Sequence, residues 1–248
     1  MLDPIILIGG FGSHWTDYRG MGKLLAKVSQ RRVFIANINR LSWAVGGITD
    51  YSLLVERAHK AVMHALKETG MQRVMIVGHS AGGLVGRAYL GDKAILPNRE
   101  AYYGHERVSH LITLGSPLRA APLAKHPGMA QVTWLEEHYP GAYYRHAVQY
   151  LTVSGKRIEG KRDGTLRERE AFANYTFVSS QGEQWGDGVV PASLTRFDDV
   201  PHLEIEDLGH SPNWGRWFGN DEGSIRQWWH VLSAGDFAPL HSFAPMNA

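Results

Sequence analysis

Residues 74–84 read Val-Met-Ile-Val-Gly-His-Ser-Ala-Gly-Gly-Leu, an apolar run followed by the pattern G-x-S-x-G. The apolar letters of 74–77 predict a buried strand, and the small residues after them predict a tight turn into a helix at 84–90. Such a turn holds Ser80 in a strained conformation with its hydroxyl above the sheet, and glycines must flank it because a Cβ would clash with backbone. We predict that Ser80 is a nucleophile. The alternative is a chance match in a chain with 28 glycines, against which the strand and helix argue.

Apolar runs alternate with helix-periodic stretches on both sides of this turn. Strands that are apolar throughout indicate a mostly parallel sheet, of about six or more strands, with helices on both faces. The predicted fold class is therefore α/β, with residues 1–248 forming a single domain. The expected strands are 5–8, 32–38, 74–77, 108–114, 150–154 and 203–205, and the expected helices are 18–28, 51–69, 84–90 and 224–232.

The regular alternation weakens after the strand that ends near Leu114. Prolines around a helical patch at 129–138 make 117–147 a cap-like insertion above the sheet edge, either a moving lid or a static cap. Residues 156–170 hold six basic residues and four acids, and we interpret them as a solvated, mobile loop rather than a lipid-headgroup site. Residues 175–179 are predicted to be extended.

Composition excludes several classes of function. The net charge of +2 does not suggest a nucleic-acid binder, and the lack of cysteine excludes disulfides, thiolate metal sites and a cysteine nucleophile. No segment approaches the ~20 apolar residues of a membrane span, and the N-terminus lacks the features of a signal peptide. The sequence shows neither zinc spacing nor a phosphate loop. We therefore expect a cytoplasmic protein that uses no metal and no cofactor.

A serine nucleophile also needs N–H donors for the oxyanion of a tetrahedral intermediate. The N–H of Ala81, directly after the nucleophile, is the first candidate. The second is the N–H of Phe11 in the turn Gly9-Gly-Phe-Gly12, where the flanking glycines let the backbone approach a substrate. A plain turn is the alternative. A dinucleotide fingerprint is excluded, because G-x-G-x-x-G starting at Gly10 requires glycine where Trp15 stands.

Catalytic triads on such sheets run in the chain order serine, acid, histidine. Asp187 lies between glycines in Trp185-Gly-Asp-Gly-Val-Val-Pro191, a tight turn in which a carboxylate can face a neighbouring loop. We predict Asp187 as the acid, the alternative being an ordinary Asp-Gly surface turn. Its rivals are Asp198 and Asp199, which lie among charged residues, and Asp207, which is too close in sequence to the predicted histidine.

The predicted base is His210, which follows the last strand through Gly209. A loop at the C-terminal end of a parallel strand is where such a base belongs. His202 precedes the same strand and falls on the wrong edge. His79 is expected to pack beside the nucleophile, and His14 is a candidate substrate contact.

The chain resembles a group of plant and cyanobacterial α/β-hydrolases that are similar to GPI inositol-deacylases and class 2 lipases. The likeness extends over nearly the whole chain and is carried by Gly10-Phe-Gly12, Gly78-His-Ser-Ala-Gly-Gly83, Thr113-Leu-Gly-Ser-Pro117, Glu136-Glu-His-Tyr-Pro-Gly-Ala-Tyr-Tyr144, Trp185-Gly-Asp-Gly-Val-Val-Pro191, His210-Ser-Pro212 and Gln227-Trp228. The resemblance implies an α/β-hydrolase fold, a triad of Ser80, Asp187 and His210, and lipase- or esterase-like activity without a cofactor. One departure is Gly9, where related lipases often carry His or Pro; backbone donation by Phe11 should survive it.

The expected function is hydrolysis of a carboxylic ester with an acyl or lipid-type substrate, through an acyl-enzyme. Thioester cleavage or acyl transfer by the same triad stays open, since these reactions differ only in leaving group and acceptor. A non-catalytic binding protein is a further alternative, against which an intact triad argues. The expected partner is the small-molecule or lipid ester, with transient contact to a membrane surface and no nucleic acid. The aromatic residues within 214–229 are expected to pack in the core.

Overall fold

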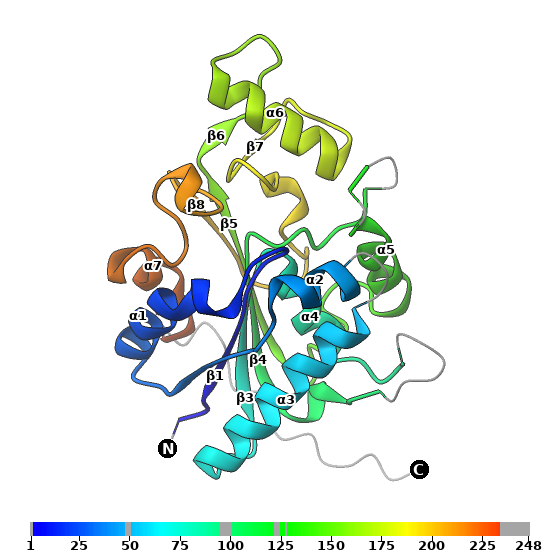
Figure 1. The fold of residues 1–248 in the computed structure, drawn as a ribbon, viewed down its shortest axis with the longest axis vertical. Helices are drawn as coiled ribbons and strands as arrows, with labels where there is room; N and C mark the ends of the chain where they lie inside the picture. Colours follow the sequence, from blue (N-terminus) through cyan, green and yellow to red (C-terminus); the bar gives the residue numbers. More distant parts are fainter. Residues whose placement is uncertain (1, 48–50, 95–100, 122–124, 127, 234–248) are drawn as a thin grey trace.

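The computed structural model describes residues 2–47, 51–94, 101–121, 125–126 and 128–233. Its centre is a six-stranded sheet in which all pairings are parallel (Figure 1). The strand order is β2-β1-β3-β4-β5-β8. The strands are β1 (Ile5–Ile8), β2 (Val33–Ile35), β3 (Val74–His79), β4 (Val108–Leu114), β5 (Gln149–Lys156) and β8 (His202–Glu206). The predicted α/β fold with a parallel sheet is confirmed.

Alternate residues of the strands supply two separate hydrophobic cores, one on each face of the sheet. In β1, Ile5 and Leu7 belong to one core and Ile6 and Ile8 to the other. The first core is covered by α1 (Arg19–Ser29) and α7 (Glu222–Ser233), and the second by α2 (Arg40–Gly46), α3 (Ser52–Thr69), α4 (Ala81–Tyr89) and α5 (Met129–His138) (Figure 1). Burial on both faces explains why β1 and residues 74–77 of β3 are apolar at every position. Among the described residues, no helix has the length and apolar character that crossing a bilayer requires.

Most of the aromatic residues within 214–229 lie in the core next to α1, whereas Trp214 packs with Ala171 and Tyr175 in a separate cluster. Phe218 and Trp228 are fully buried, and the indole N–H of Trp228 donates to the carbonyl oxygen of Phe218 at 3.0 Å. Trp229 is also buried, whereas Trp217 is partly buried against the same core. Core packing is thus their role, as expected from the sequence.

Between β5 and β8 the chain leaves the sheet and forms an excursion above its C-terminal edge (Figure 1). The excursion consists of a short antiparallel pair, β6 (Ile158–Glu159) and β7 (Trp185–Gly186), and the helix α6 (Leu166–Ser179). The prediction that 175–179 is extended is therefore wrong, because these residues form the last turns of α6. Ala171 and Tyr175, four residues apart, face the same side of α6 and are fully buried, so tertiary packing overrides the strand preference of the local letters.

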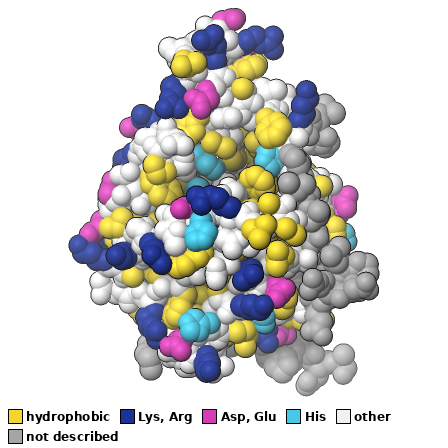
Figure 2. Space-filling model, viewed as in Figure 1, with side chains coloured by type: hydrophobic (Ala, Val, Ile, Leu, Met, Phe, Trp, Pro, Cys, Tyr) yellow, Lys and Arg dark blue, Asp and Glu magenta, His cyan; other side chains and the backbone are white. Residues whose placement is uncertain are grey.

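The charged stretch 156–170 is only in part the predicted loop. Its side chains are largely exposed and 160–165 form a turn, but the stretch also contains β6 and the first residues of α6. Thr165 caps α6 by accepting from the backbone N–H of Glu168, whose carboxylate in turn accepts from the N–H of Thr165. Figure 2 shows Lys and Arg side chains gathered over the tip of the excursion. Several of them lie in ion pairs, namely Arg157 with Asp207, Lys161 with Glu159 and Glu168, and Arg167 with Glu170.

The insertion 117–147 packs against the second core through α5, although residues 122–124 and 127 of it lie outside the described part of the chain. Arg87 of α4 is buried and holds this segment at two points. Its guanidinium donates to the carbonyl oxygen of Leu118 at 3.0 Å and to that of Tyr139 at 2.7 Å. These two bonds tie the described residues on both sides of α5 to α4, and both the moving lid and the static cap stay predictions.

The anchoring role of Arg87 can be tested by stability measurements. Arg87→Met should lower the free energy of unfolding by about 2–4 kcal/mol, because two buried carbonyl groups lose their donors. Arg87→Lys should restore only part of the loss, since an ammonium group cannot span both carbonyls as the guanidinium fork does. Urea denaturation followed by tryptophan fluorescence measures both changes.

Arg226→Met is the matched control, because Arg226 makes only an exposed ion pair with Glu222. Its effect should stay within about 0.5 kcal/mol. Equal stabilities of Arg87→Met and Arg226→Met would contradict the anchoring role.

Candidate active site

Ser80 occupies the turn between β3 and α4 with φ of 53° and ψ of −129°, a strained backbone conformation for a residue with a Cβ. Two flanking glycines permit this turn. A Cβ on Gly78 would lie 2.5 Å from the backbone nitrogen of Gly83, and one on Gly82 would lie 2.3 Å from the carbonyl oxygen of Ile8. Both contacts are with backbone, which cannot move aside. The close packing predicted for this turn is therefore observed.

The loop after β1 lies directly against this turn. A Cβ on Gly10 would come within 2.9 Å of the Cβ of Ser80, so only glycine allows the approach. Ala81, the first residue of α4, and Phe11 of the loop line the same cavity as Ser80. The structure thus brings both predicted oxyanion donors beside the serine. Their donation to an oxyanion stays a prediction.

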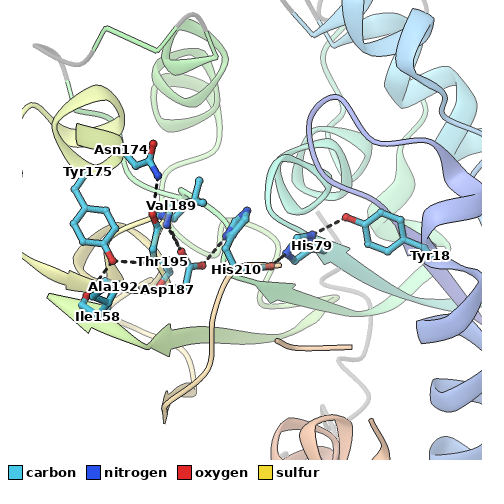
Figure 3. A network of polar contacts seen from close by, with 12 residues as sticks. Tyr18, His79, Ile158, Asn174, Tyr175, Asp187, Val189, Ala192, Thr195 and His210 are labelled. Carbon is cyan, nitrogen blue, oxygen red and sulfur yellow. Dashed lines mark hydrogen bonds and ion pairs between the residues drawn. The ribbon is translucent and has the colours of Figure 1, made fainter. Parts of the chain in front are cut away.

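Asp187 and His210 form a buried pair (Figure 3). The Nδ1 atom of His210 lies 2.7 Å from Oδ2 of Asp187, and the exposed fractions of the two residues are only 8% and 1%. The other carboxylate oxygen accepts from the N–H groups of Val189 at 3.0 Å and Val190 at 2.7 Å. A carboxylate can only accept, so Nδ1 carries the proton and Nε2 of the neutral ring is free to take one.

The main chain joins the same two residues a second time. The backbone N–H of His210 donates to the carbonyl oxygen of Asp187 at 2.8 Å. Helix α6 supports the turn from the other side, since Asn174 donates to the carbonyl oxygen of Gly188 and the hydroxyl of Tyr175 accepts from its N–H (Figure 3). The acid is thus fixed by backbone as well as by side-chain contacts.

The rival residues lie elsewhere. Each rival carboxylate forms an ion pair at the surface: Asp198 with Arg119, Asp199 with Arg145, and Asp207 with Arg157. His202 begins β8 and contacts the hydroxyl of Thr152, at the opposite edge of the sheet from His210. His14 caps the short helix η1 (Trp15–Tyr18) and is not among the residues that line the cavity. Among the described residues, no cluster of three His, Asp or Glu side chains is suited to hold a metal ion.

Ser80 and His210 line a cavity of about 340 Å³, within the range of small-ligand sites. Its walls are mainly apolar and come from α4, the start of α5, the end of α6 and the segment after Asp187. The apolar wall residues include Leu84, Met129, Phe177, Val178, Val189 and Val190. The side chains of Tyr51, His126 and Asn174, which carry polar groups, also line it, and burial lowers the pKa of His126.

The letters of 175–179 predict an extended segment, so they do not reveal the contribution of α6 to this wall. One signal could have revealed it. Thr165 and Glu168 have the spacing of a capping box, which predicts a helix beginning at residue 166. A helix from there to 179 places Asn174, Phe177 and Val178 within one turn of each other.

Comparisons with known proteins agree with this fold. The model of the family described as "PGAP1-like alpha/beta domain" matches residues 5–200. The product of gene lin2722 from Listeria innocua is 15% identical, with 100% of this chain and 97% of that chain covered and a TM-score of 0.52. At that identity the likeness concerns the fold alone. No match was found among curated proteins.

Two further solved structures show weaker likeness. A putative hydrolase of the alpha/beta superfamily from Xanthomonas campestris pv. campestris is 16% identical over 94% of this chain and 99% of that chain, with a TM-score of 0.49. The monoacylglycerol lipase of Paleococcus ferrophilus is 13% identical over 93% of this chain and 96% of that chain, with a TM-score of 0.47.

Asp187→Asn should keep the fold but lower kcat by about 10⁴-fold, because a carboxamide can donate to Nδ1 and so favour the wrong tautomer of His210. Hydrolysis of a p-nitrophenyl ester measures the loss, and circular dichroism checks the fold. Asp199→Asn is the matched control, since that carboxylate is half-exposed and paired with Arg145. Equal activity of the two variants would exclude Asp187 as the acid.

Proposed function

The chain belongs to the PGAP1-like alpha/beta domain family, and from this membership and the geometry of its site we propose that it is a serine hydrolase that cleaves carboxylic esters. One observation carries the proposal. Ser80, on a strained turn, shares a cavity with His210, whose Nδ1 is held by the buried Asp187. A hydroxyl becomes a useful nucleophile only beside a base that is itself oriented by a third group.

The proposed reaction proceeds through an acyl-enzyme. Nε2 of His210 takes the proton of Ser80 while Oγ attacks the ester carbonyl carbon, and the N–H groups of Ala81 and Phe11 receive the negative charge on the oxygen. Collapse of the tetrahedral intermediate breaks the ester C–O bond, and His210 gives its proton to the departing alcohol. Water, deprotonated by the same imidazole, then releases the acid and restores Ser80. The carboxylate of Asp187 stabilises the charged imidazole in both steps.

The cavity walls support an acyl or lipid-type substrate. Burying one methylene group in an apolar cavity is worth ~0.8 kcal/mol, so an acyl chain binds there favourably. Phe11 and Phe177 line the cavity while remaining 47% and 44% exposed, and they offer apolar surface to a chain entering from a lipid aggregate or membrane surface. A cytoplasmic location stays a prediction from the sequence.

The geometry of the site bears differently on two alternatives to ester hydrolysis. Thioester cleavage and acyl transfer use the same three residues, and the choice depends on the leaving group and acceptor. A pure binding protein is disfavoured by the backbone of Ser80. Holding a residue in that conformation costs ~1–3 kcal/mol, and binding alone gives no reason to retain the strain.

Ser80→Ala should remove nearly all ester hydrolysis, with a loss approaching ~10⁶-fold in kcat. A fluorophosphonate probe should label the wild-type protein at Ser80 and leave Ser80→Ala unlabelled. Ser193→Ala is the control, because Ser193 is an exposed serine that bonds Gln184 at the surface. Undiminished hydrolysis by Ser80→Ala would refute the proposed nucleophile.

Phe177→Ala should reduce kcat/KM for long acyl esters and leave acetate esters nearly unchanged, because only a long chain reaches that wall. In the wild type, each added methylene should raise kcat/KM by up to about fourfold until the cavity is filled. A series of p-nitrophenyl esters from acetate to palmitate measures both effects. Leu166→Ala, on the same helix but 74% exposed and away from the cavity, should leave the series unchanged.

A further inference from the structure

A buried chain of hydrogen bonds runs behind the site, from the loop after β1 to the main chain of His210. Figure 3 shows its part from Tyr18 through His79 to His210. The N–H of Gly10 lies 2.8 Å from the hydroxyl oxygen of Tyr18, and this oxygen lies 2.7 Å from Nδ1 of His79. Nε2 of His79 lies 2.9 Å from the carbonyl oxygen of His210. The two side chains in this series, Tyr18 and His79, are both more than nine-tenths buried.

Only one arrangement of protons satisfies this chain when His79 is neutral. The carbonyl oxygen of His210 can only accept, so Nε2 of His79 carries the proton and Nδ1 is the acceptor. The hydroxyl of Tyr18 must then donate to Nδ1, and its oxygen accepts from Gly10. Burial lowers the pKa of His79 well below its usual value, assisted by the nearby ring of His210, and burial raises the pKa of Tyr18 to about 12.

Aromatic side chains enclose the middle of the chain. The ring centroid of His79 lies 5.6 Å from that of Trp217, 5.9 Å from that of Phe218 and 4.8 Å from that of His210. Hydrogen bonds in such an apolar enclosure are stronger than in water, and a broken one leaves a buried polar atom without a partner. This chain of hydrogen bonds is therefore stiff.

The two ends of the chain are the parts that catalysis must align. Gly10 directly precedes Phe11, the candidate oxyanion donor, and contacts Ser80. The other end is the peptide of His210, the candidate base. His79 adjoins Ser80 in sequence, so the chain joins the oxyanion loop, the nucleophile turn and the base loop.

We propose that Tyr18 and His79 are positioning residues that hold the base and the oxyanion loop at a fixed spacing on either side of Ser80. They touch no substrate and transfer no proton; they act through the main chains of Gly10 and His210. This inference rests on the proposed function, since the spacing matters only if the site is catalytic. A displacement of ~1 Å in such a site can lower the rate by ~10²-fold.

Three substitutions remove different hydrogen bonds of this chain. Tyr18→Phe removes the hydroxyl and breaks the bonds to Gly10 and His79. His79→Gln can place an amide N–H near Nε2 and keep the bond to His210, whereas His79→Asn can place an amide oxygen near Nδ1 and keep only the bond to Tyr18. We expect Tyr18→Phe and His79→Asn to lower kcat about 10- to 100-fold with KM changed by less than about twofold, and His79→Gln to retain more activity than His79→Asn.

Tyr89→Phe is the matched control. The hydroxyl of Tyr89 lies 3.5 Å from Nδ1 of His59, a contact of the same kind between α4 and α3 and outside the cavity lining. This variant should keep kcat, and its melting temperature should fall less than that of Tyr18→Phe, whose hydroxyl makes two shorter hydrogen bonds. Wild-type kcat in both Tyr18→Phe and His79→Asn would overturn the proposal, as would an equal loss in Tyr89→Phe.

A second measurement does not depend on activity. Nitrogen-15 spectra of the imidazole rings should show His79 of the wild type as the Nε2–H tautomer, and should show a changed Nδ1 signal in Tyr18→Phe. A proton on Nδ1 of His79 in the wild type would overturn the hydrogen-bond chain. If the proposed function fails, the wild type hydrolyses no ester and Ser80 is not labelled by the fluorophosphonate, so the two failures are distinct.

Discussion

The packing of Gly82 against the end of β1 is the constraint on which the rest of the site depends. Carbonyl oxygens of Ile8 and Gly9 lie where a side chain at position 82 would begin, so strand and helix meet backbone to backbone. Backbone is far stiffer than a side chain, and the meeting fixes the loop 9–12 beside Ser80. The hydrogen bonds that run from Gly10 through Tyr18 and His79 begin in that loop.

The sheet could be predicted because burial on both faces leaves a direct mark on composition. The strand β1 is apolar at all four positions. The glycines and the serine at the end of β3 and directly after it restrict the backbone to few conformations. Helix α6 could not be recognised from its second half, since Tyr175 to Ser179 is rich in aromatic and β-branched residues. Its helical state depends on Trp214, which is distant in sequence and packs against Ala171 and Tyr175.

Chain order and turn context were enough to select Asp187 and His210 over their rivals, and the structure pairs these two through side chain and main chain. The match to the family ends at residue 200, so the role of His210 rests on chain order and on its pairing with Asp187. The hydrogen bond between Tyr18 and His79 could not be predicted, because the two residues lie 61 positions apart and no local pattern links them. The cavity walls could not be predicted for the same reason, because several separate segments of the sequence supply them.

The hydrogen bonds that Arg87 makes on both sides of α5 have a consequence for ligand binding. The described residues on either side of α5 are thus joined to α4, which lines the cavity, through one buried guanidinium. Walls that are held in place before binding reduce the entropy cost of ordering a site around its ligand.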